Sequence, residues 1–233
     1  MNIDKESSLK SSHVIYDITK FTHLDFPNHL AAIIWFSGCN MRCDYCYNKD
    51  IVFAKKGIIS MNEALDFLHS RVSLLDGVVL SGGEATAYDL VTFCQAIKEL
   101  GFSIKLDTNG TNFNNLKKLL DLKLLDYIAL DYKAPKEKFT QITHSHKYDD
   151  FSKTLNILLD SDIEFEVRTT LHADLLSPAD INTIIDDLYA RGYSKTYYIQ
   201  EFVETQENIA QLTKPKLSFN KKALKNKLPV IWR

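Results

Sequence analysis

The sequence lacks long apolar runs and has little net charge, and each shortage excludes a class of protein. No apolar stretch approaches the roughly 20 residues that a bilayer-spanning helix needs. The 28 basic and 30 acidic residues give a net charge of −2, so no overall field favours nucleic acid or a membrane surface. The polar N-terminus is unlike a signal peptide. We therefore predict a cytoplasmic protein that binds neither nucleic acid nor membrane.

Cysteines and flexible linkers are also scarce. Only 4 cysteines occur, and three of them crowd into one short segment, which fits a reducing compartment and a metal site better than a disulfide framework. No stretch rich in Pro, Gly or Ser divides the chain, so we predict one domain over residues 14–203, after a flexible N-terminus (1–13). A basic C-terminal tail (204–233) follows. Its structure is left open: it covers the open side of the fold or touches a partner.

The chain does contain a regular alternation of apolar strands and amphipathic helices. Helices are expected to begin at Ser60 (a capping box with Glu63), Asp89 and Ser177. The six expected strands lie at 30–36, 77–80, 102–106, 127–130, 164–170 and 197–202. Alternating units of this kind predict an α/β fold with parallel strands. Six units are too few for a closed eight-stranded barrel, so we predict a partial (βα)6 barrel.

Three cysteines follow the first of these strands as Cys39-x3-Cys43-x2-Cys46. Three thiolates on one loop suit iron–sulfur or zinc chemistry. A [4Fe–4S] cluster held by three thiolates keeps one iron open for another ligand, whereas a structural zinc site needs four protein ligands. His23 or His29 would have to complete such a zinc site. Cys94 lies on the apolar face of its helix and is predicted to be a buried thiol instead of a fourth ligand.

Polar residues stand where the later strands end, which is where α/β folds build their sites. Arg168 lies inside a buried strand and demands an anionic partner, either a ligand carboxylate or an ion pair with Glu84 or Asp131. The other groups also fit tight turns, with Asn109 and Gly110 in the left-handed conformation. The candidate residues at these strand ends are Gly82, Gly83, Glu84, Asp107, Thr108, Asn109, Asp131, Lys133 and Arg168.

Taken in this order, the cysteine motif, Gly82-Gly83-Glu84 and a partial (βα)6 barrel resemble the radical S-adenosylmethionine superfamily. Segments 20–27, 106–110, 130–135 and 165–170 resemble the glycyl-radical-enzyme activases, most closely the longer anaerobic ribonucleoside-triphosphate reductase activating proteins. The resemblance covers about residues 14–203 and leaves the tail outside. Two positions depart from the usual pattern, namely Ala85 where proline is common and Tyr47 where histidine is frequent.

The resemblance implies a role for each candidate residue. Cys39, Cys43 and Cys46 would hold a [4Fe–4S] cluster, whose open iron is chelated by the methionyl amine and carboxylate of S-adenosyl-L-methionine. Gly82, Gly83 and Glu84 would meet the amine, and Arg168 the carboxylate. Tyr45 would contact the adenine. Asp107, Thr108 and Asn109 would lie near the methionine and ribose, and Asp131 and Lys133 also belong to the cofactor site. Asp107 and Asp131 could additionally hold a monovalent cation.

The implied activity is reductive cleavage of S-adenosylmethionine to a 5′-deoxyadenosyl radical, which then generates a glycyl radical on a partner enzyme. The implied partner is anaerobic ribonucleotide reductase, with reduced flavodoxin or ferredoxin as electron donor. Two rivals belong to the same superfamily: a small-molecule enzyme like 7-carboxy-7-deazaguanine synthase, and a peptide maturase. Larger maturases carry further C-terminal cysteines, and none follows Cys94 here. A zinc-binding interaction module is the alternative from another class.

Overall fold

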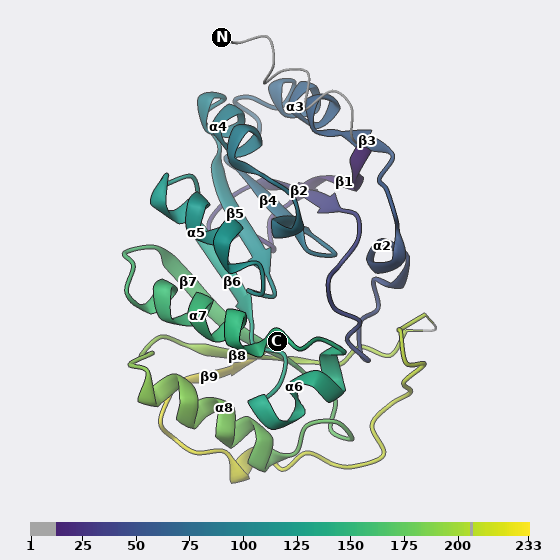
Figure 1. Cartoon of the computed structure of the whole chain (residues 1–233), viewed down its shortest axis with the longest axis vertical. Coiled ribbons are helices and arrows are strands. Elements are labelled where there is room, and N and C mark those ends of the chain that lie inside the picture. Colours follow the sequence, from purple (N-terminus) through teal and green to yellow (C-terminus); the bar gives the residue numbers. More distant parts are fainter. Residues whose placement is uncertain (1–12, 206) are drawn as a thin grey trace. The chain divides into compact units, whose positions relative to one another are not determined.

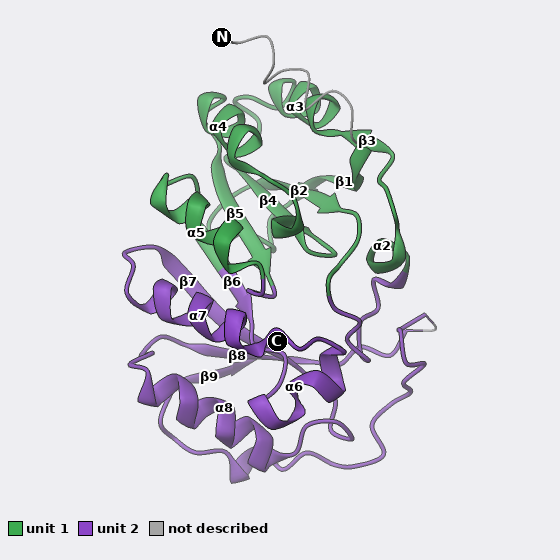
Figure 2. Cartoon of the chain, viewed as in Figure 1, with its two compact units in different colours: residues 1–40, 50–108, 112–128 green, residues 41–49, 109–111, 129–233 purple. Residues whose placement is uncertain are grey.

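The computed structural model describes residues 13–205 and 207–233, and these form two compact units (Figures 1 and 2). Unit 1 comprises the chain through Asn40, Asp50–Thr108 and Asn112–Ile128. Unit 2 comprises Met41–Lys49, Asn109–Thr111 and Ala129–Arg233. The flexible N-terminus that we predicted lies, except for His13, outside the described residues.

Unit 1 holds a sheet with the strand order β3-β1-β2-β4-β5. Its strands are β1 (His13–Thr22), β2 (Ala31–Phe36), β3 (Ile59–Ser60), β4 (Gly77–Gly82) and β5 (Ser103–Thr108). Its helices are α2 (Lys49–Phe53, whose first residue belongs to unit 2), α3 (Met61–His69), the short 3-10 helix η1 (Ala85–Ala87), α4 (Val91–Glu99) and α5 (Phe113–Asp121). β2, β4 and β5 are parallel neighbours, whereas β1 runs antiparallel to β2.

The strands of unit 1 follow from runs that are apolar on both faces. Ile34 pairs with Leu80, and Leu80 in turn with Leu106, and all three side chains are fully buried. Helices cover such parallel strands on both faces, which removes the usual alternation with polar residues. Two of the expected strands, 30–36 and 77–80, are confirmed here with shifts of one or two residues at their ends.

Local signals set the helix starts in unit 1. Ser60 caps α3 through the predicted capping box with Glu63. α4 begins one residue later than predicted, since Leu90 occupies the cap position, although the Asp89 carboxylate still accepts from the Val91 amide at 3.1 Å.

Unit 2 follows the same plan in the strand order β6-β7-β8-β9. Its strands are β6 (Tyr127–Asp131, whose first two residues belong to unit 1), β7 (Glu164–Leu171), β8 (Tyr197–Glu201) and β9 (Val230–Trp232). Its helices are α6 (Lys136–Thr143), α7 (Tyr148–Leu159), α8 (Pro178–Ala190) and η2 (Lys221–Ala223). β7, β8 and β9 are parallel, and the predicted cap Ser177 forms a capping box with Asp180.

The basic tail is built into unit 2. Its last strand, β9, extends the sheet beyond β8, and the Arg233 guanidinium donates to both carboxylate oxygens of the buried Glu166 at 3.1 Å each. All six predicted strands are therefore present, and the α/β class with mostly parallel strands is confirmed. Across the described residues, no helix has the length and apolar character that crossing a membrane requires.

Candidate functional site

The residues of the cysteine motif are divided between the two units. Cys39 belongs to unit 1 and follows the last residue of β2, Phe36, by three positions, whereas Cys43 and Cys46 belong to unit 2. All three are free thiols, with Cys43 buried and the other two partly exposed. Within the described residues no three His, Cys, Asp or Glu side chains gather as a metal site. The donor set itself, three soft thiolates on one loop, fits an iron–sulfur cluster.

Within unit 2, the C-terminal end of α6 holds one edge of the cysteine loop. The Arg42 amide donates to the Thr143 carbonyl oxygen at 2.9 Å, and the Asp44 amide donates to that of Ile142 at 3.1 Å. His144 Nε2 lies 2.7 Å from Asp44 Oδ1, while about half of the His144 side chain is exposed. The loop has no regular secondary structure, so these bonds supply its order.

Gly82 and Gly83 lie so close to the backbone of Phe36 and Gly38 that neither position has room for a side chain. Gly82 has a φ of +116°, and a Cβ there would lie 2.3 Å from the Phe36 nitrogen. A Cβ on Gly83 would lie 1.9 Å from the Gly38 carbonyl oxygen. The Gly83 and Glu84 amides donate to the carbonyl oxygens of Phe36 and Gly38 at 2.9 and 3.0 Å. Both glycines therefore fix the end of β4 against the residues that lead into Cys39.

Glu84 is 2% exposed and is the most deeply buried carboxylate of the candidate set. It caps η1, as the turn interpretation predicted, and accepts from the Thr86 amide at 3.2 Å and the Thr86 hydroxyl at 2.5 Å. The Thr108 hydroxyl also donates to it at 2.7 Å. The ends of β4 and β5 are thus joined through a carboxylate whose bonds within unit 1 come from neutral donors.

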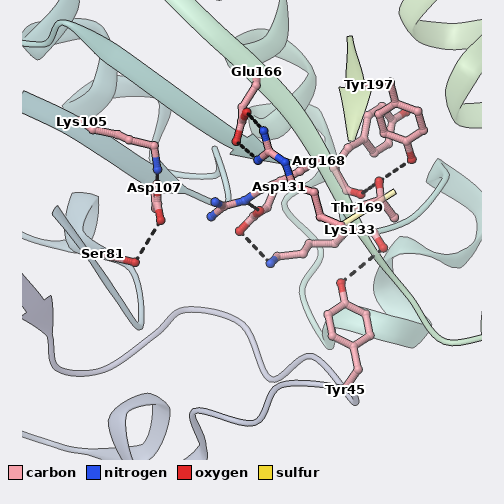
Figure 3. A network of polar contacts seen from close by, with 12 residues as sticks. Tyr45, Ser81, Lys105, Asp107, Asp131, Lys133, Glu166, Arg168, Thr169 and Tyr197 are labelled. Atoms are coloured by element: carbon pink, nitrogen blue, oxygen red, sulfur yellow. Dashed lines mark hydrogen bonds and ion pairs between the residues drawn. The ribbon is translucent and has the colours of Figure 1, made fainter. Parts of the chain in front are cut away.

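Asp107 is paired with a lysine that sequence reasoning missed. Lys105 is 2% exposed and its ammonium contacts Asp107 Oδ1, while the Ser81 hydroxyl donates to Oδ2 at 3.3 Å (Figure 3). A sequence signal did exist: residues two apart on a strand share a face, so a lysine inside a buried strand indicates Asp107 as its partner.

Asn109 directly follows β5 and belongs to unit 2. Its side-chain oxygen accepts from the Thr111 amide at 3.0 Å and from the Thr111 hydroxyl at 2.6 Å. The expected left-handed conformation is confirmed at Gly110, with a φ of +73°, but the same expectation for Asn109 is wrong. The Asx turn does not need it.

Asp131, Lys133 and Arg168 form a cationic cluster in unit 2 (Figure 3). Asp131 accepts from Arg168 Nε at 2.5 Å and from Lys133 Nζ at 2.9 Å, so the ion-pair interpretation of Arg168 with Asp131 is confirmed. Burial alone would raise the pKa of the Asp131 carboxyl, but the two cations outweigh it and hold that pKa well below its usual range.

Tyr45 lies beside this cationic cluster. Its ring is 4% exposed, its centroid is 6.0 Å from Lys133 Nζ, and its hydroxyl donates to the Lys133 carbonyl oxygen at 3.5 Å (Figure 3). Burial raises the pKa of the Tyr45 hydroxyl well above its ordinary value, so the side chain is neutral. It presents an apolar ring face and one polar tip.

Cys94 behaves as predicted for a core thiol. It is fully buried on α4, and burial raises the pKa of its thiol to about 12. A thiol with that pKa stays protonated at neutral pH and is a poor metal ligand.

The sequence matches the Radical SAM superfamily over residues 33–188. The Methanocaldococcus jannaschii protein MJ1227, whose name assigns it provisionally to the glycyl-radical enzyme activating enzymes, is 29% identical over 206 residues, or 81% of this chain and 84% of that protein. The pyruvate formate-lyase-activating enzyme of Streptococcus mutans is 28% identical over 160 residues, or 62% of this chain and 60% of that enzyme.

Solved structures share the fold at low sequence identity. Streptococcus suis SuiB, bound to its precursor peptide SuiA, has a TM-score of 0.63 at 14% identity over 78% of this chain and 42% of that one. A structure of anSMEcpe with bound AdoMet has a TM-score of 0.59 at 18% identity, covering 72% of this chain and 50% of that one. QueE from Escherichia coli has a TM-score of 0.53 at 17% identity, over 82% and 84% of the two chains. The predicted fold class is confirmed by these likenesses.

Proposed function

Because this chain belongs to the radical SAM superfamily, an enzyme family that uses a [4Fe–4S] cluster and S-adenosylmethionine, we propose that it generates a glycyl radical on a partner enzyme. The partner that we propose is anaerobic ribonucleoside-triphosphate reductase. The observation that carries the activase proposal is the similarity to MJ1227, which extends over 84% of that protein. The family match also favours an enzyme over a zinc-binding interaction module.

Cys39, Cys43 and Cys46 are the proposed cluster ligands. They combine soft donor atoms with partial burial, and the bonds from the Arg42 and Asp44 amides to α6 order the loop around the second and third of them. When bound, the cluster and S-adenosylmethionine supply a 5′-deoxyadenosyl radical by one-electron reduction of the sulfonium. The protein's own part is to fix the ligands and keep the site dry.

The charges of the strand ends support the proposed contacts to the methionyl group. Glu84 offers a carboxylate held by three hydrogen bonds, which suits an ammonium group. Arg168 offers a guanidinium, whose planar set of donors suits a carboxylate. Gly82 and Gly83 would place backbone groups beside the same amine, and Asp107, Thr108 and Asn109 would meet the methionine and ribose. The Tyr45 ring is the proposed contact of the adenine, with Lys133 beside it.

A monovalent cation would have to share both of its proposed ligands. Asp107 is already paired with Lys105, and Asp131 with Lys133 and Arg168. A bound cation would therefore share two carboxylates that already form ion pairs with Lys or Arg side chains.

The activase proposal is tested by electron paramagnetic resonance on anaerobically purified and reconstituted protein. With S-adenosylmethionine and reduced flavodoxin or ferredoxin as electron donor, a glycyl radical is expected on anaerobic ribonucleotide reductase. Pyruvate formate-lyase in place of the reductase serves as the matched control. A radical on the lyase alone would refute the named partner, and a radical on neither would refute the activase proposal.

Synthesis of a small molecule is the second candidate. It is supported by 27% identity over 99 residues, or 40% of this chain, with the 7-carboxy-7-deazaguanine synthase of Rickettsia prowazekii. The match spans only 41% of that enzyme, which ranks it below the activase proposal. Formation of 7-carboxy-7-deazaguanine by the reconstituted protein, without a glycyl radical on either partner, would favour this candidate.

A further inference from the structure

The tail of unit 2 carries a short segment, residues 207–213, that we call the tail loop. It is hydrogen-bonded to the cysteine loop through carbonyl oxygens, whereas α6 accepts from amides of the same loop. The Ile209 amide donates to the Cys46 carbonyl oxygen at 3.0 Å, and the Ala210 amide donates to the Asp44 carbonyl oxygen at 3.0 Å. The resemblance to known families ended at about residue 203, so nothing in the sequence assigned this segment a role.

Asn208 gives the tail loop its conformation. Asn208 is 1% exposed, and both its side-chain nitrogen and its side-chain oxygen are hydrogen-bonded to nearby backbone groups. Nδ2 donates to the carbonyl oxygens of Thr205 at 3.1 Å and Leu212 at 2.7 Å, and Oδ1 accepts from the Leu212 amide at 2.6 Å. One side chain therefore closes the turn that aims the two donor amides at the cysteine loop.

Residues after β7 anchor the far end of the tail loop. His172 is 1% exposed, and its Nε2 lies 2.9 Å from the Thr213 carbonyl oxygen. The Asp174 carboxylate accepts from the amides of Lys216 at 3.0 Å and Leu217 at 2.8 Å. The segment is thus fixed to the sheet of unit 2 at one end and to the cysteine loop along its middle.

The backbone of Cys46 is consequently held on both sides. Its amide donates to the Cys43 carbonyl oxygen at 2.9 Å, and its own carbonyl oxygen accepts from Ile209. With both peptide groups fixed, the Cys46 thiol can move only by rotation of its side chain. A ligand held in this way keeps its geometry when the metal group changes oxidation state.

We propose that the tail loop is a positioning element of the cluster-binding loop and that Asn208 is the residue that sets it. The inference rests on the proposed ligation by Cys43 and Cys46, and it is independent of which partner receives the radical. The Asn208 side chain bonds to Thr205 and Leu212, so it acts on the cysteine loop through the amides of Ile209 and Ala210.

Asn208→Ala tests the proposal, with Asn220→Ala as the matched control. Asn220 belongs to the same tail and caps η2 with its side-chain oxygen, at an exposed position. In reconstituted full-length protein, Asn208→Ala is expected to release iron to a chelator about tenfold faster, the effect of losing roughly two net hydrogen bonds. The paramagnetic resonance spectrum of the reduced cluster should change as well. Asn220→Ala should match the wild type in both measurements.

Equal iron release and equal spectra in Asn208→Ala and the wild type would overturn the proposal. So would an equal acceleration in both variants, since that would indicate a general effect of the tail. A wild type that takes up no iron would instead refute ligation by the cysteines, and a loss of glycyl radical formation alone would concern the proposed function.

Hydrogen exchange of the wild type keeps the proposal testable if Asn208→Ala does not fold. The amides of Ile209 and Ala210 are expected to be protected, and reconstitution with iron and sulfide should slow their exchange further. Exchange at the rate of an unprotected amide, or protection that is the same before and after reconstitution, would contradict the inference.

Discussion

The strand ends of the two units hold their carboxylates in different ways. In unit 1, Asp107 is paired with the buried Lys105, and Glu84 accepts from the amide and hydroxyl of Thr86 and from the hydroxyl of Thr108. In unit 2, Asp131 is paired with both Lys133 and Arg168. The same strand–helix plan thus places Glu84 among neutral donors in one unit and Arg168 beside a carboxylate in the other.

This difference matters because a methionyl group carries an ammonium and a carboxylate together. In the proposed function Glu84 meets the ammonium and Arg168 meets the carboxylate. Hydrogen bonds within each unit orient these two side chains. Glu84 accepts from hydroxyl and amide donors, and Arg168 donates to Asp131. The comparison makes four predictions, from complete loss of the cluster to a shallow dependence on pH.

The largest effect is expected from removing a thiolate of either unit. Cys39→Ala in unit 1 and Cys43→Ala in unit 2 should each abolish the brown chromophore and the cleavage of S-adenosylmethionine, since both are proposed cluster ligands. Iron and sulfide analysis with absorption spectroscopy provides the measurement. Cys94→Ala is the control and should keep the cluster, because Cys94 is a core thiol of α4. A variant of Cys43 that kept its colour would rule out that ligand.

The buried lysine of unit 1 predicts the next largest effect. Asp107→Ala would leave the Lys105 ammonium, with a side chain only 3% exposed, without its ion-pair partner. Leaving one charge of a buried pair uncompensated costs about 3–5 kcal/mol in unfolding free energy.

The double variant Asp107→Ala with Lys105→Met should recover much of that loss, because no charge then stays buried. Urea unfolding gives the unfolding free energies of Asp107→Ala, Lys105→Met and the double variant, each compared with the wild type. A double variant as unstable as the sum of the two single variants would show that the two residues are not coupled.

The sequence was sufficient for the strands because runs such as 77–80 are apolar on both faces, and only a covered parallel strand buries both. It was less informative about Lys105, which was passed over as part of an apolar run although its spacing from Asp107 indicated a shared face. α6 was missed too, although Phe139 and Ile142 stand three residues apart and both are buried. The spacing of these two residues was the signal.

The tail loop could not have been predicted from the sequence. It holds the cysteine loop through the backbone amides of Ile209 and Ala210, and any residue except proline supplies such a donor. Its one side-chain determinant, Asn208, is an ordinary turn residue in sequence terms. The role of this asparagine depends on what lies beside the turn, which only the fold provides.

Binding of S-adenosylmethionine sharpens the comparison between the units. Arg168→Met should raise the dissociation constant of S-adenosylmethionine by about 10- to 100-fold, which corresponds to the loss of a charge-assisted hydrogen bond of roughly 1.5–3 kcal/mol. Glu84→Gln should raise the dissociation constant by a similar or smaller factor, because the amide keeps an acceptor for Thr86 and Thr108.

Equilibrium binding to reconstituted protein measures both variants and their combination. Additive losses would support one contact to the carboxylate and another to the ammonium. Arg168→Lys is the control, and it should recover only part of the affinity because it keeps the charge but loses the planar fork. Unchanged affinity in Arg168→Met would remove that residue from the site.

The smallest effect is the dependence of stability on acid pH that the cationic cluster creates. Lys133 and Arg168 hold the pKa of Asp131 well below the value of about 3.9 for an unfolded aspartate. The unfolded chain therefore binds a proton on this group at a higher pH than the folded protein does. Its contribution to stability is fully present above about pH 4 and is lost as the pH falls towards the folded pKa, at a rate that cannot exceed roughly 1.4 kcal/mol per pH unit.

Asp131→Asn carries no such proton, so its unfolding free energy, measured with urea between about pH 5 and pH 3, should fall less steeply than that of the wild type. Parallel slopes would mean that the two cations do not stabilise the ionised Asp131, and their pairing with it would then have no measurable consequence for folding.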